Sequence, residues 1–420
     1  MNGAPLAYGI DFGTSNSQIA LAWADRTEVV SVGGRRVAEN LPSVIYLNRD
    51  GNQAAGDDAI EQYLVSAGVD SRLLVGIKSD LADPSFKSTQ SWGYSWTPPE
   101  LVAVVMLALK RAADRHTGHT CRRVVLGHPV AFVGTEGPDY DLRQETAMKR
   151  LIESARLAGF EEIDTLEEPS AAAQDEDPGP GGILVALDFG GGTFDVAVVD
   201  YGRDPAEVIG LQGAAIGGER FDQLLFNAKV APELGLLEEY GAPDGSRHRL
   251  PARVMAGSRS MLDLRSLLLD YTLPEILRRF QTFTGGERLV LLEQLLYGGF
   301  AYSFFEAVED AKIRLSVDEQ TTIQFRGGGF DMSVPVTRIE FESLIENDIA
   351  LIEATIQNAL ADAGVTAASA TRVIRTGGSS SIPLFVDMVM AMFGSERMVQ
   401  RPPFTAVVQG LASYSQMVWS

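Results

Sequence analysis

Two segments of the sequence place an acidic residue directly before a turn of small residues, a combination that can bind a metal ion and phosphate. The first segment runs from Asp11 to Ala22 and the second from Asp188 to Val199. In each, an apolar run ends in Asp, a turn of small residues follows, and a second apolar run comes after it. This layout predicts a β-hairpin with a carboxylate at its tip, formed once in each half of the chain.

The two turns are suited to phosphate because their small residues leave backbone N–H groups accessible, and consecutive N–H groups form a concave nest for oxygens. A carboxylate repels phosphate, so Asp11 and Asp188 predict a magnesium ion between the two. One such hairpin is typical of an ordinary β-turn, whereas two in equivalent places indicate a nucleotide clamped between two lobes. The predicted backbone donors are Gly13, Thr14 and Ser15 in the first turn, and Gly190, Gly191 and Gly192 in the second. Asn16 and Thr193, which follow these residues, are also predicted to bind the nucleotide.

Composition narrows the class of protein and its partners. A chain of 420 residues favours two domains. Its 35 Lys and Arg against 56 Asp and Glu give a net charge of −21, which disfavours nucleic acid and anionic membranes as partners. The single Cys121 excludes an internal disulfide framework, no signal peptide precedes the first predicted strand, and the apolar stretch 101–109 is too short to span a membrane. We therefore expect a soluble cytoplasmic protein.

Strands and helices alternate along the chain, which predicts an α/β fold. A breaker-rich acidic loop at 175–182 separates the halves, and the long segment 231–299 reads as an inserted helical subdomain interrupted by prolines. The predicted strands are 7–10, 17–23, 43–47, 123–128, 183–187, 195–200, 207–214, 321–325, 333–337 and 372–376. The predicted helices are 98–117, 141–158, 218–230, 302–316, 338–363, 383–392 and 404–416.

Several ordered motifs carry a resemblance to a known family. They are Tyr8-Gly-Ile-Asp-Phe-Gly-Thr-Ser15, Glu168-Pro-Ser-Ala-Ala-Ala173, Leu187-Asp-Phe-Gly-Gly-Gly-Thr-Phe-Asp195, Ile216-Gly-Gly-Glu-Arg-Phe-Asp222, Glu309-Asp-Ala-Lys-Ile-Arg-Leu-Ser316 and Thr376-Gly-Gly-Ser-Ser-Ser-Ile-Pro383. The whole chain resembles the nucleotide-binding region of the 70-kilodalton heat-shock (DnaK-like) chaperones, in the actin-like ATPase superfamily. It is most similar to their short YegD-like branch. The reasons are the long insertion before Glu309 and the variant residues Ala-Lys-Ile-Arg-Leu-Ser in the motif that Glu309 begins.

The resemblance implies a two-lobed actin-like ATPase fold, built from duplicated RNase H-like domains with inserted subdomains around a central nucleotide cleft. Lobe I would comprise residues 1–186 and 400–420, with a smaller subdomain at about 39–114. Lobe II would comprise residues 187–399, with an inserted helical subdomain at about 226–316. The predicted helix 404–416 matches the second connecting helix of the chaperones, and Trp419 and Ser420 follow shortly after it. We therefore expect no peptide-binding domain in this chain.

Residue types suggest how ATP or ADP and Mg²⁺ would be handled. Asp11 and Asp188 would hold hydrated magnesium, while Asp195 or Glu168 would orient the attacking water and Thr193 would bond a terminal phosphate oxygen. Asp195 has a local alternative, as a carboxylate bonded to turn N–H groups.

The family also has a lysine beside the γ-phosphate. Here two alignments compete for it, one placing Lys78 and the other Arg72 at that position. We favour Lys78 because a compact ammonium suits a single phosphate oxygen. The alternative for Lys78 is a solvated surface lysine.

The nucleoside end rests on the resemblance and on helical spacing, which puts Glu309, Lys312 and Ser316 on one face. Two departures matter: Ile313 and Ser381 stand where the chaperones have the arginines that sandwich adenine. The acidic residue of the second connecting helix is replaced by Phe404. We expect weak base stacking and poor discrimination between ATP and GTP. The other predicted nucleotide-binding residues are Gly217, Gly218, Glu219, Gly377, Gly378 and Ser379.

The function predicted first is a slow Mg-dependent ATPase related to the heat-shock chaperones, whose lobe closure is read by a protein partner or client. Two alternatives remain: an actin-like filament protein that polymerises on ATP, and a nucleotide sensor with vestigial hydrolysis. Other candidate sites are weak. His116 and His119 lack a third metal ligand, and Cys121 is expected to be a packed small hydrophobe.

Overall fold

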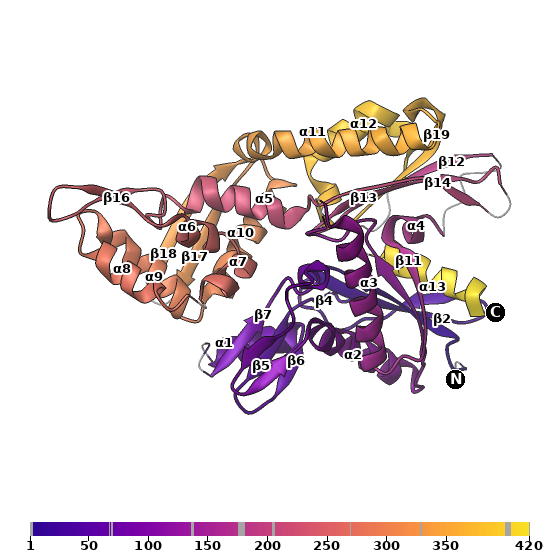
Figure 1. Ribbon diagram of the computed structural model, residues 1–420. Coiled ribbons are helices and arrows are strands. Elements are labelled where there is room, and N and C mark those ends of the chain that lie inside the picture. Colours follow the sequence, from indigo (N-terminus) through magenta and orange to yellow (C-terminus); the bar gives the residue numbers. More distant parts are fainter. Residues whose placement is uncertain are drawn as a thin grey trace. The chain divides into compact units, whose positions relative to one another are not determined.

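The computed structural model describes residues 3–66, 68, 70–135, 138–174, 181–203, 206–268, 270–327, 330–399 and 405–419. The chain forms two compact units, each made of segments distant in the sequence. Unit 1 comprises residues 1–60, 76–218 and 348–420, and unit 2 comprises residues 61–75 and 219–347. Figure 1 labels many of the elements of both units.

The first sheet of unit 1 contains the first predicted hairpin. Strand β1 (Ala7–Phe12) pairs antiparallel with β2 (Asn16–Ala22), so that Asp11 lies opposite Gln18. On its other side β1 pairs parallel with β10 (Arg123–His128), which pairs parallel with β11 (Glu162–Glu167). Short strands complete the far edge: β3 (Thr27–Val29) and β4 (Leu41–Pro42), both beside β2. The predicted hairpin is confirmed.

The second sheet repeats this arrangement with different residues. Strand β12 (Ile183–Phe189) pairs antiparallel with β13 (Phe194–Asp200), which puts Asp188 opposite Asp195. Strand β12 also pairs parallel with β19 (Ala370–Thr376), as β1 does with β10. The outer strands are β14 (Glu207–Ala214), antiparallel to β13, and β20 (Met398–Val399), parallel to β19. The same topology in two sheets confirms the duplication that the two hairpins predicted.

Helices cover these sheets and connect them. Helix α4 (Glu168–Ala173) is buried along its whole length and packs on strands of both sheets, including β10 and β12. Helix α13 (Ala406–Trp419) packs on β1, β2 and α4. The two helices approach closely because Gly410 has no side chain: a Cβ there would lie 1.7 Å from the carbonyl oxygen of Ala171. The other long helices that lie wholly in unit 1 are α2 (Pro98–Thr117), α3 (Tyr140–Leu157) and α12 (Pro383–Phe393).

Helix α2 begins and ends as its sequence predicts. The Thr97 hydroxyl accepts from the backbone N–H of Glu100, whose carboxylate accepts from Thr97 N in return, which is a capping box. The helix ends at Gly118 in the left-handed conformation. Smaller elements of unit 1 are β5 (Ile45–Asn48), β6 (Gln53–Ala55), β8 (Thr89–Ser91) and β9 (Tyr94–Trp96).

Unit 2 is mostly helical with one long hairpin. Helix α5 (Gly218–Leu225) continues into a π-helical turn at Phe226–Val230, and α10 (Ala301–Leu315) packs on the hairpin of β17 (Gln320–Gly327) and β18 (Phe330–Thr337). An aromatic core joins these elements, with Phe304 against both Phe226 and Phe325. Between α5 and α10 lie β15 (Glu239–Gly241), β16 (Arg247–Arg249), α6 (Ala252–Gly257), α7 (Met261–Leu267), α8 (Leu273–Gln281) and α9 (Leu289–Tyr297). Strand β7 (Ser71–Leu74) also belongs to this unit.

Three helices belong partly to each unit. They are α5, of which Gly218 belongs to unit 1, together with α1 (Asp57–Ser66) and α11 (Arg338–Asp362).

Some expectations need correction. Strand β11 was not predicted, because Glu162–Glu167 is half-buried and lacks the apolar alternation that marks strands. The segment 231–299 is mostly helical as predicted, but it also holds the short β15–β16 hairpin. Most of the predicted loop 175–182, and Phe404, lie outside the described residues. In the part of the chain that the structure describes, no helix combines the length and apolar character needed to cross a membrane.

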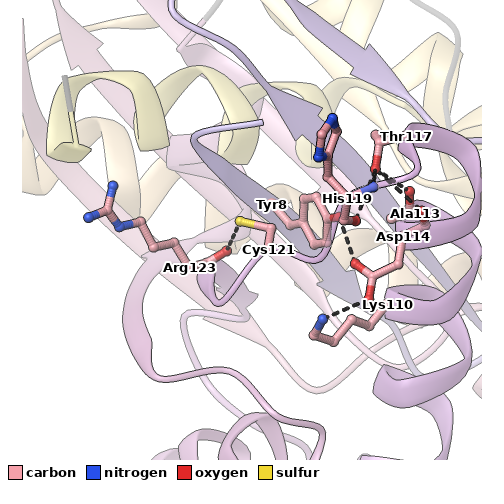
Figure 2. Close-up of polar contacts among 8 residues, drawn as sticks. All are labelled: Tyr8, Lys110, Ala113, Asp114, Thr117, His119, Cys121 and Arg123. Carbon is pink, nitrogen blue, oxygen red and sulfur yellow. Dashed lines mark hydrogen bonds and ion pairs between the residues drawn. The ribbon is translucent and has the colours of Figure 1, made fainter. Parts of the chain in front are cut away.

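In unit 1, a polar network near Cys121 connects strand β1 to helix α2 (Figure 2). The Tyr8 hydroxyl and the Lys110 ammonium both donate to Asp114, at 2.8 and 2.9 Å. The Cys121 thiol donates to the carbonyls of Leu6 and Arg123, and burial raises its pKa. A buried neutral thiol behaves as the packed small hydrophobe that the sequence predicted.

Candidate functional site

The first hairpin turn has a geometry that only glycine permits at its start. A Cβ on Gly13 would lie 2.2 Å from the carbonyl oxygen of Asn16. The turn is also held from outside, because the Ser43 hydroxyl donates to Gly13 O at 2.7 Å and Ser43 N donates to Ser15 O at 2.8 Å. With its carbonyls bound by Ser43, the turn is fixed in one conformation. Nothing in the sequence marked Ser43 for this role.

The second turn is the meeting point of three glycine-containing segments. Gly190 N donates to Thr193 O, and Gly190 O accepts from Gly218 N at 3.1 Å and from the Ser379 hydroxyl at 2.9 Å. A Cβ on Gly217 would lie 2.2 Å from the carbonyl oxygen of Gly191. Residues predicted from separate motifs therefore come together around one turn in unit 1.

Gly377 meets the same turn from strand β19. Its φ of +80° and ψ of 150° are accessible essentially to glycine alone. A Cβ there would lie 2.2 Å from the carbonyl oxygen of Phe189. Gly378 begins the 3₁₀ turn Gly378–Ser381 that carries Ser379. The close approach explains why the motif needs a glycine at this point.

The two hairpin turns lie against each other. A Cβ on Gly191 would be 2.3 Å from the Ser15 hydroxyl oxygen, and one on Gly192 would be 2.6 Å from the Thr14 hydroxyl oxygen. Beside them is a cavity of about 10 Å³, room for about one water molecule. Its lining consists of Thr14, Lys78, Ser79, Pro129, Phe132, Val133 and Thr193.

Acidic side chains surround one lysine next to these turns. The Lys78 ammonium donates to Glu168 Oε1 at 2.8 Å, and both side chains are buried. Asp188 Oδ1 accepts from the Thr376 hydroxyl at 2.8 Å, and Asp195 Oδ1 accepts from the backbone N–H of Val130 at 3.0 Å. Asp195 Oδ2 is buried with no hydrogen-bond partner among the described residues. Thr376 is the first residue of the motif Thr376–Pro383, but its hydrogen bond to Asp188 was not predicted.

The charges in this cluster perturb one another. Loss of water and repulsion by Glu168 raise the pKa of Asp188 to about 6 and raise the pKa of Asp195 well above its ordinary value. The same two causes raise the pKa of Asp11, partly offset by Lys78. Burial alone would lower the pKa of Lys78, but the charges of Glu168 and Asp11 outweigh it and raise that pKa. The side chains of Asp11, Lys78, Glu168, Asp188 and Asp195 therefore lie within electrostatic reach of one another in unit 1.

The site carries more negative charge than its single lysine can balance, which fits a divalent cation. A cation beside Asp11 and Asp188 would lower the pKa values that burial and repulsion by Glu168 raise, and Asp195 Oδ2 is buried with no hydrogen-bond partner among the described residues. Among the described residues, no group of three or more His, Cys, Asp or Glu side chains could hold a metal by itself. This is compatible with magnesium, which keeps several waters and takes few protein ligands alongside phosphate.

Unit 2 contains the predicted nucleoside residues Glu309, Lys312 and Ser316, together with Glu219, which was predicted to bind the nucleotide. On α10, the Lys312 ammonium pairs with Asp222 Oδ2 at 2.7 Å and is buried. Ile313 is half-exposed on the same helix. Arg72, the alternative to Lys78, lies on β7 in unit 2, and Ser381 is exposed at the end of its turn in unit 1. Asp222 was not predicted as a functional residue, although it ends a quoted motif.

Comparison with protein families decides the assignment. The family model described as Hsp70 protein matches residues 7–233 and 302–418. The chain belongs to the Hsp70 family. Its mixed sheets and duplicated hairpins have the two-lobed actin-like ATPase fold of that family. The match includes all the predicted phosphate, metal and nucleoside residues and leaves out 234–301, which is almost the segment predicted to be an insertion.

Hsp70 membership gives the general activity. Proteins of this family bind ATP or ADP with Mg²⁺ and are generally ATPases, so this chain is a chaperone-related member of an ATP-binding ATPase family. The acid excess beside the two phosphate-type turns agrees with that chemistry.

Proposed function

We propose that this protein is a slow magnesium-dependent ATPase whose nucleotide state is read by a protein partner or client. One observation carries the proposal: in unit 1, four carboxylates and one lysine cluster beside two abutting small-residue turns. Phosphate transfer needs positioning and charge stabilisation more than covalent chemistry, and this cluster supplies both.

Asp11 and Asp188 are the residues that would hold magnesium. Each is the penultimate residue of a central strand, next to a hairpin turn, and each has a pKa raised by burial and by repulsion from Glu168. The bound cation would neutralise charge on the phosphates. It would also relieve the repulsion among these carboxylates, so nucleotide and metal should bind together.

The backbone N–H groups of 13–16 and 190–193 are the phosphate donors in this proposal. Both turns are fixed in advance, the first by Ser43 and the second by Gly218 and Ser379. Donors that need no rearrangement stabilise developing charge most effectively. Thr193, which lines the small cavity with Thr14 and Lys78, would bond a terminal phosphate oxygen.

Three groups remain for the attacking water and the γ-phosphate. Asp195 has one oxygen fixed by Val130 N and a second oxygen that is buried and available to accept a proton or a water hydrogen bond. Glu168 is the alternative water-orienting carboxylate. Lys78, held beside Glu168, would share its charge with a phosphate oxygen, and its burial favours it over Arg72 for this role.

Chain connectivity supports transmission of the nucleotide state. The chain crosses from unit 1 to unit 2 within helices α1, α5 and α11. Gly218 is the first residue of α5, and its N–H is bonded to the second turn. A movement of that turn would therefore be passed directly to the start of this helix. The unmatched segment 234–301 supports the YegD-like branch, and Glu309, Lys312 and Ser316 are the proposed nucleoside contacts.

The test is ATP hydrolysis with and without magnesium, measured alongside sedimentation. A slow Mg-dependent release of phosphate with no pelletable polymer is expected. A reversible ATP-dependent polymer would favour the filament function instead, and tight Mg-ATP binding without any phosphate release would favour a nucleotide sensor.

A further inference from the structure

One arginine on helix α3 binds four backbone carbonyls of the segment that follows Lys78. Arg150 Nη1 donates to the carbonyl oxygens of Asp80, Leu81 and Asp83 at 3.0, 3.0 and 2.8 Å. Its Nη2 donates to the carbonyl oxygen of Phe86 at 2.9 Å. A single guanidinium therefore fixes the whole stretch from 80 to 86.

The carbonyls that Arg150 binds lie at and just after the end of a short helix. Ser79–Ala82 forms a short 3₁₀ helix with Lys78 at its N-cap, and its internal bonds run from Ser79, Asp80 and Leu81 N–H to the carbonyls of 76, 77 and 78. The 3₁₀ bonds end at this point, so Arg150 supplies donors where the helix stops, and the carbonyl of Asp83 also accepts from Phe86 N–H. A guanidinium has five donors in a rigid planar fork and can satisfy several convergent carbonyls, whereas an ammonium has three donors on a flexible stem.

The segment that Arg150 holds begins two residues after Lys78. The buried side chains of Ile77, Leu81 and Ala82 anchor one side of the turn, and Arg150 binds the carbonyls that leave it. Since Lys78 is the N-cap of this helix, the position of the 3₁₀ turn sets how far its ammonium reaches toward Glu168 and Asp11.

We propose that Arg150 is a positioning residue of the ATPase site, which holds the Lys78 ammonium in place through the backbone of 79–86. This inference rests on the proposed function, because it requires Lys78 to act on the terminal phosphate. A displacement of a charged group by about 1 Å can cost on the order of 100-fold in rate. Arg150 itself is not proposed to contact the substrate. Its loss should nevertheless reduce turnover, because Lys78 would be displaced.

A double-mutant cycle between Arg150→Met and Lys78→Met tests this coupling. We expect Arg150→Met to lower kcat by about tenfold in the wild-type background and by less than about twofold in the Lys78→Met background, since the lysine it positions is then gone. ADP affinity should change less than about twofold in Arg150→Met, whereas ATP affinity should weaken more, because only ATP carries the γ-phosphate. Arg150→Lys should give an intermediate kcat.

Controls separate the outcomes. Lys149→Met removes an exposed cation next to Arg150 on the same helix and should leave kcat unchanged. If Arg150→Met lowers kcat equally in both backgrounds, or weakens ATP and ADP equally, Arg150 has only a structural role and the inference is wrong. If Lys78→Met keeps wild-type turnover, the proposed role of Lys78 fails first. Should Arg150→Met not fold, Arg150→Lys is measured in the same cycle, and equal effects in both backgrounds again overturn the inference.

Discussion

The Lys78 ammonium lies 2.8 Å from Glu168 Oε1, and the two side chains are only 8% and 6% exposed. The pair joins the end of a loop to the first residue of α4, the helix that packs on both sheets of unit 1. A buried ion pair is costly to break, because removal of one partner leaves the other charged and unsolvated.

Lys78→Met should therefore destabilise the metal-free protein, by about 3 kcal/mol, as it strands Glu168 among three aspartates. Urea unfolding followed by circular dichroism gives the free energy of unfolding. The matched control is Lys149→Met, whose exposed pair with Glu145 should contribute less than about 1 kcal/mol. Equal losses for the two variants would contradict the burial argument.

Asp188 makes a specific prediction about pH. Its pKa is about 6 in the folded protein against an ordinary value of 3.8, so between these values the folded state binds more protons than the unfolded state. The free energy of unfolding must therefore fall as pH rises across this window and stay low above it. The shift corresponds to a loss of up to about 3 kcal/mol.

Asp188→Asn should remove this contribution, so metal-free Asp188→Asn should be more stable than wild type at neutral pH and similar to it at pH of about 4. Chemical unfolding of both proteins at several pH values measures the difference. Raised pKa values of Asp11 and Asp195 act in the same direction and leave part of the slope in place. If Asp188→Asn is less stable than wild type at neutral pH, the charged Asp188 carboxylate does not destabilise the metal-free folded protein, and the prediction is wrong.

Gly377, which packs against the second hairpin turn, can be tested with Gly364 as a matched control. Both have positive φ, +80° and +67°, but a Cβ on Gly377 would lie 2.2 Å from the Phe189 carbonyl oxygen whereas one on Gly364 would meet nothing within 4 Å. Gly364→Ala should cost about 1 kcal/mol for its left-handed backbone. Gly377→Ala should cost at least about 3 kcal/mol, because the second turn must also shift.

Nucleotide affinity separates a local effect from a general one. We expect Gly377→Ala to weaken ATP binding at least about tenfold, by calorimetry, because it displaces the donors of the second turn. Gly364→Ala should leave affinity unchanged. Similar affinities for both variants would mean that the second turn does not contact the phosphates.

Much of the fold followed from local patterns. The paired hairpins have strong strand signals on both sides of a small-residue turn, and α2 has a capping box at one end and a left-handed glycine at the other. Strand β11 has no such signal, since its neighbours in the sheet rather than its own sequence fix it. Helix 218–230 was placed correctly, but its change to a π-helical turn at Phe226 left no trace in the sequence.

The site was predicted less completely because its contacts join distant segments. Motifs pointed to Asp11, Glu168, Asp188 and Asp195, but no local pattern could predict that Lys78 is buried and paired with Glu168. Ser43, Thr376 and Arg150 act on the backbone or on another side chain, and no local pattern reports such a contact.

Base selectivity is a further expectation. Ile313 and Ser381 replace two guanidinium groups of the chaperones, each worth on the order of 1 kcal/mol against an aromatic base. ATP and GTP should therefore bind with similar affinity, weakly for this family, and Ile313→Arg combined with Ser381→Arg should tighten ATP binding. Calorimetry on the wild type checks this. Strongly adenine-selective binding at nanomolar concentration would mean that other contacts hold the base.

The most direct measurement is the magnesium-dependent rate of ATP hydrolysis in wild type, Asp11→Asn and Asp188→Asn, with the exposed Asp25→Asn as control. If the two hairpin aspartates hold the metal against the phosphates, each site variant should lose at least about tenfold in rate, and the control should match the wild type. Unchanged magnesium-dependent turnover in both site variants would contradict a metal–nucleotide site at the paired hairpins.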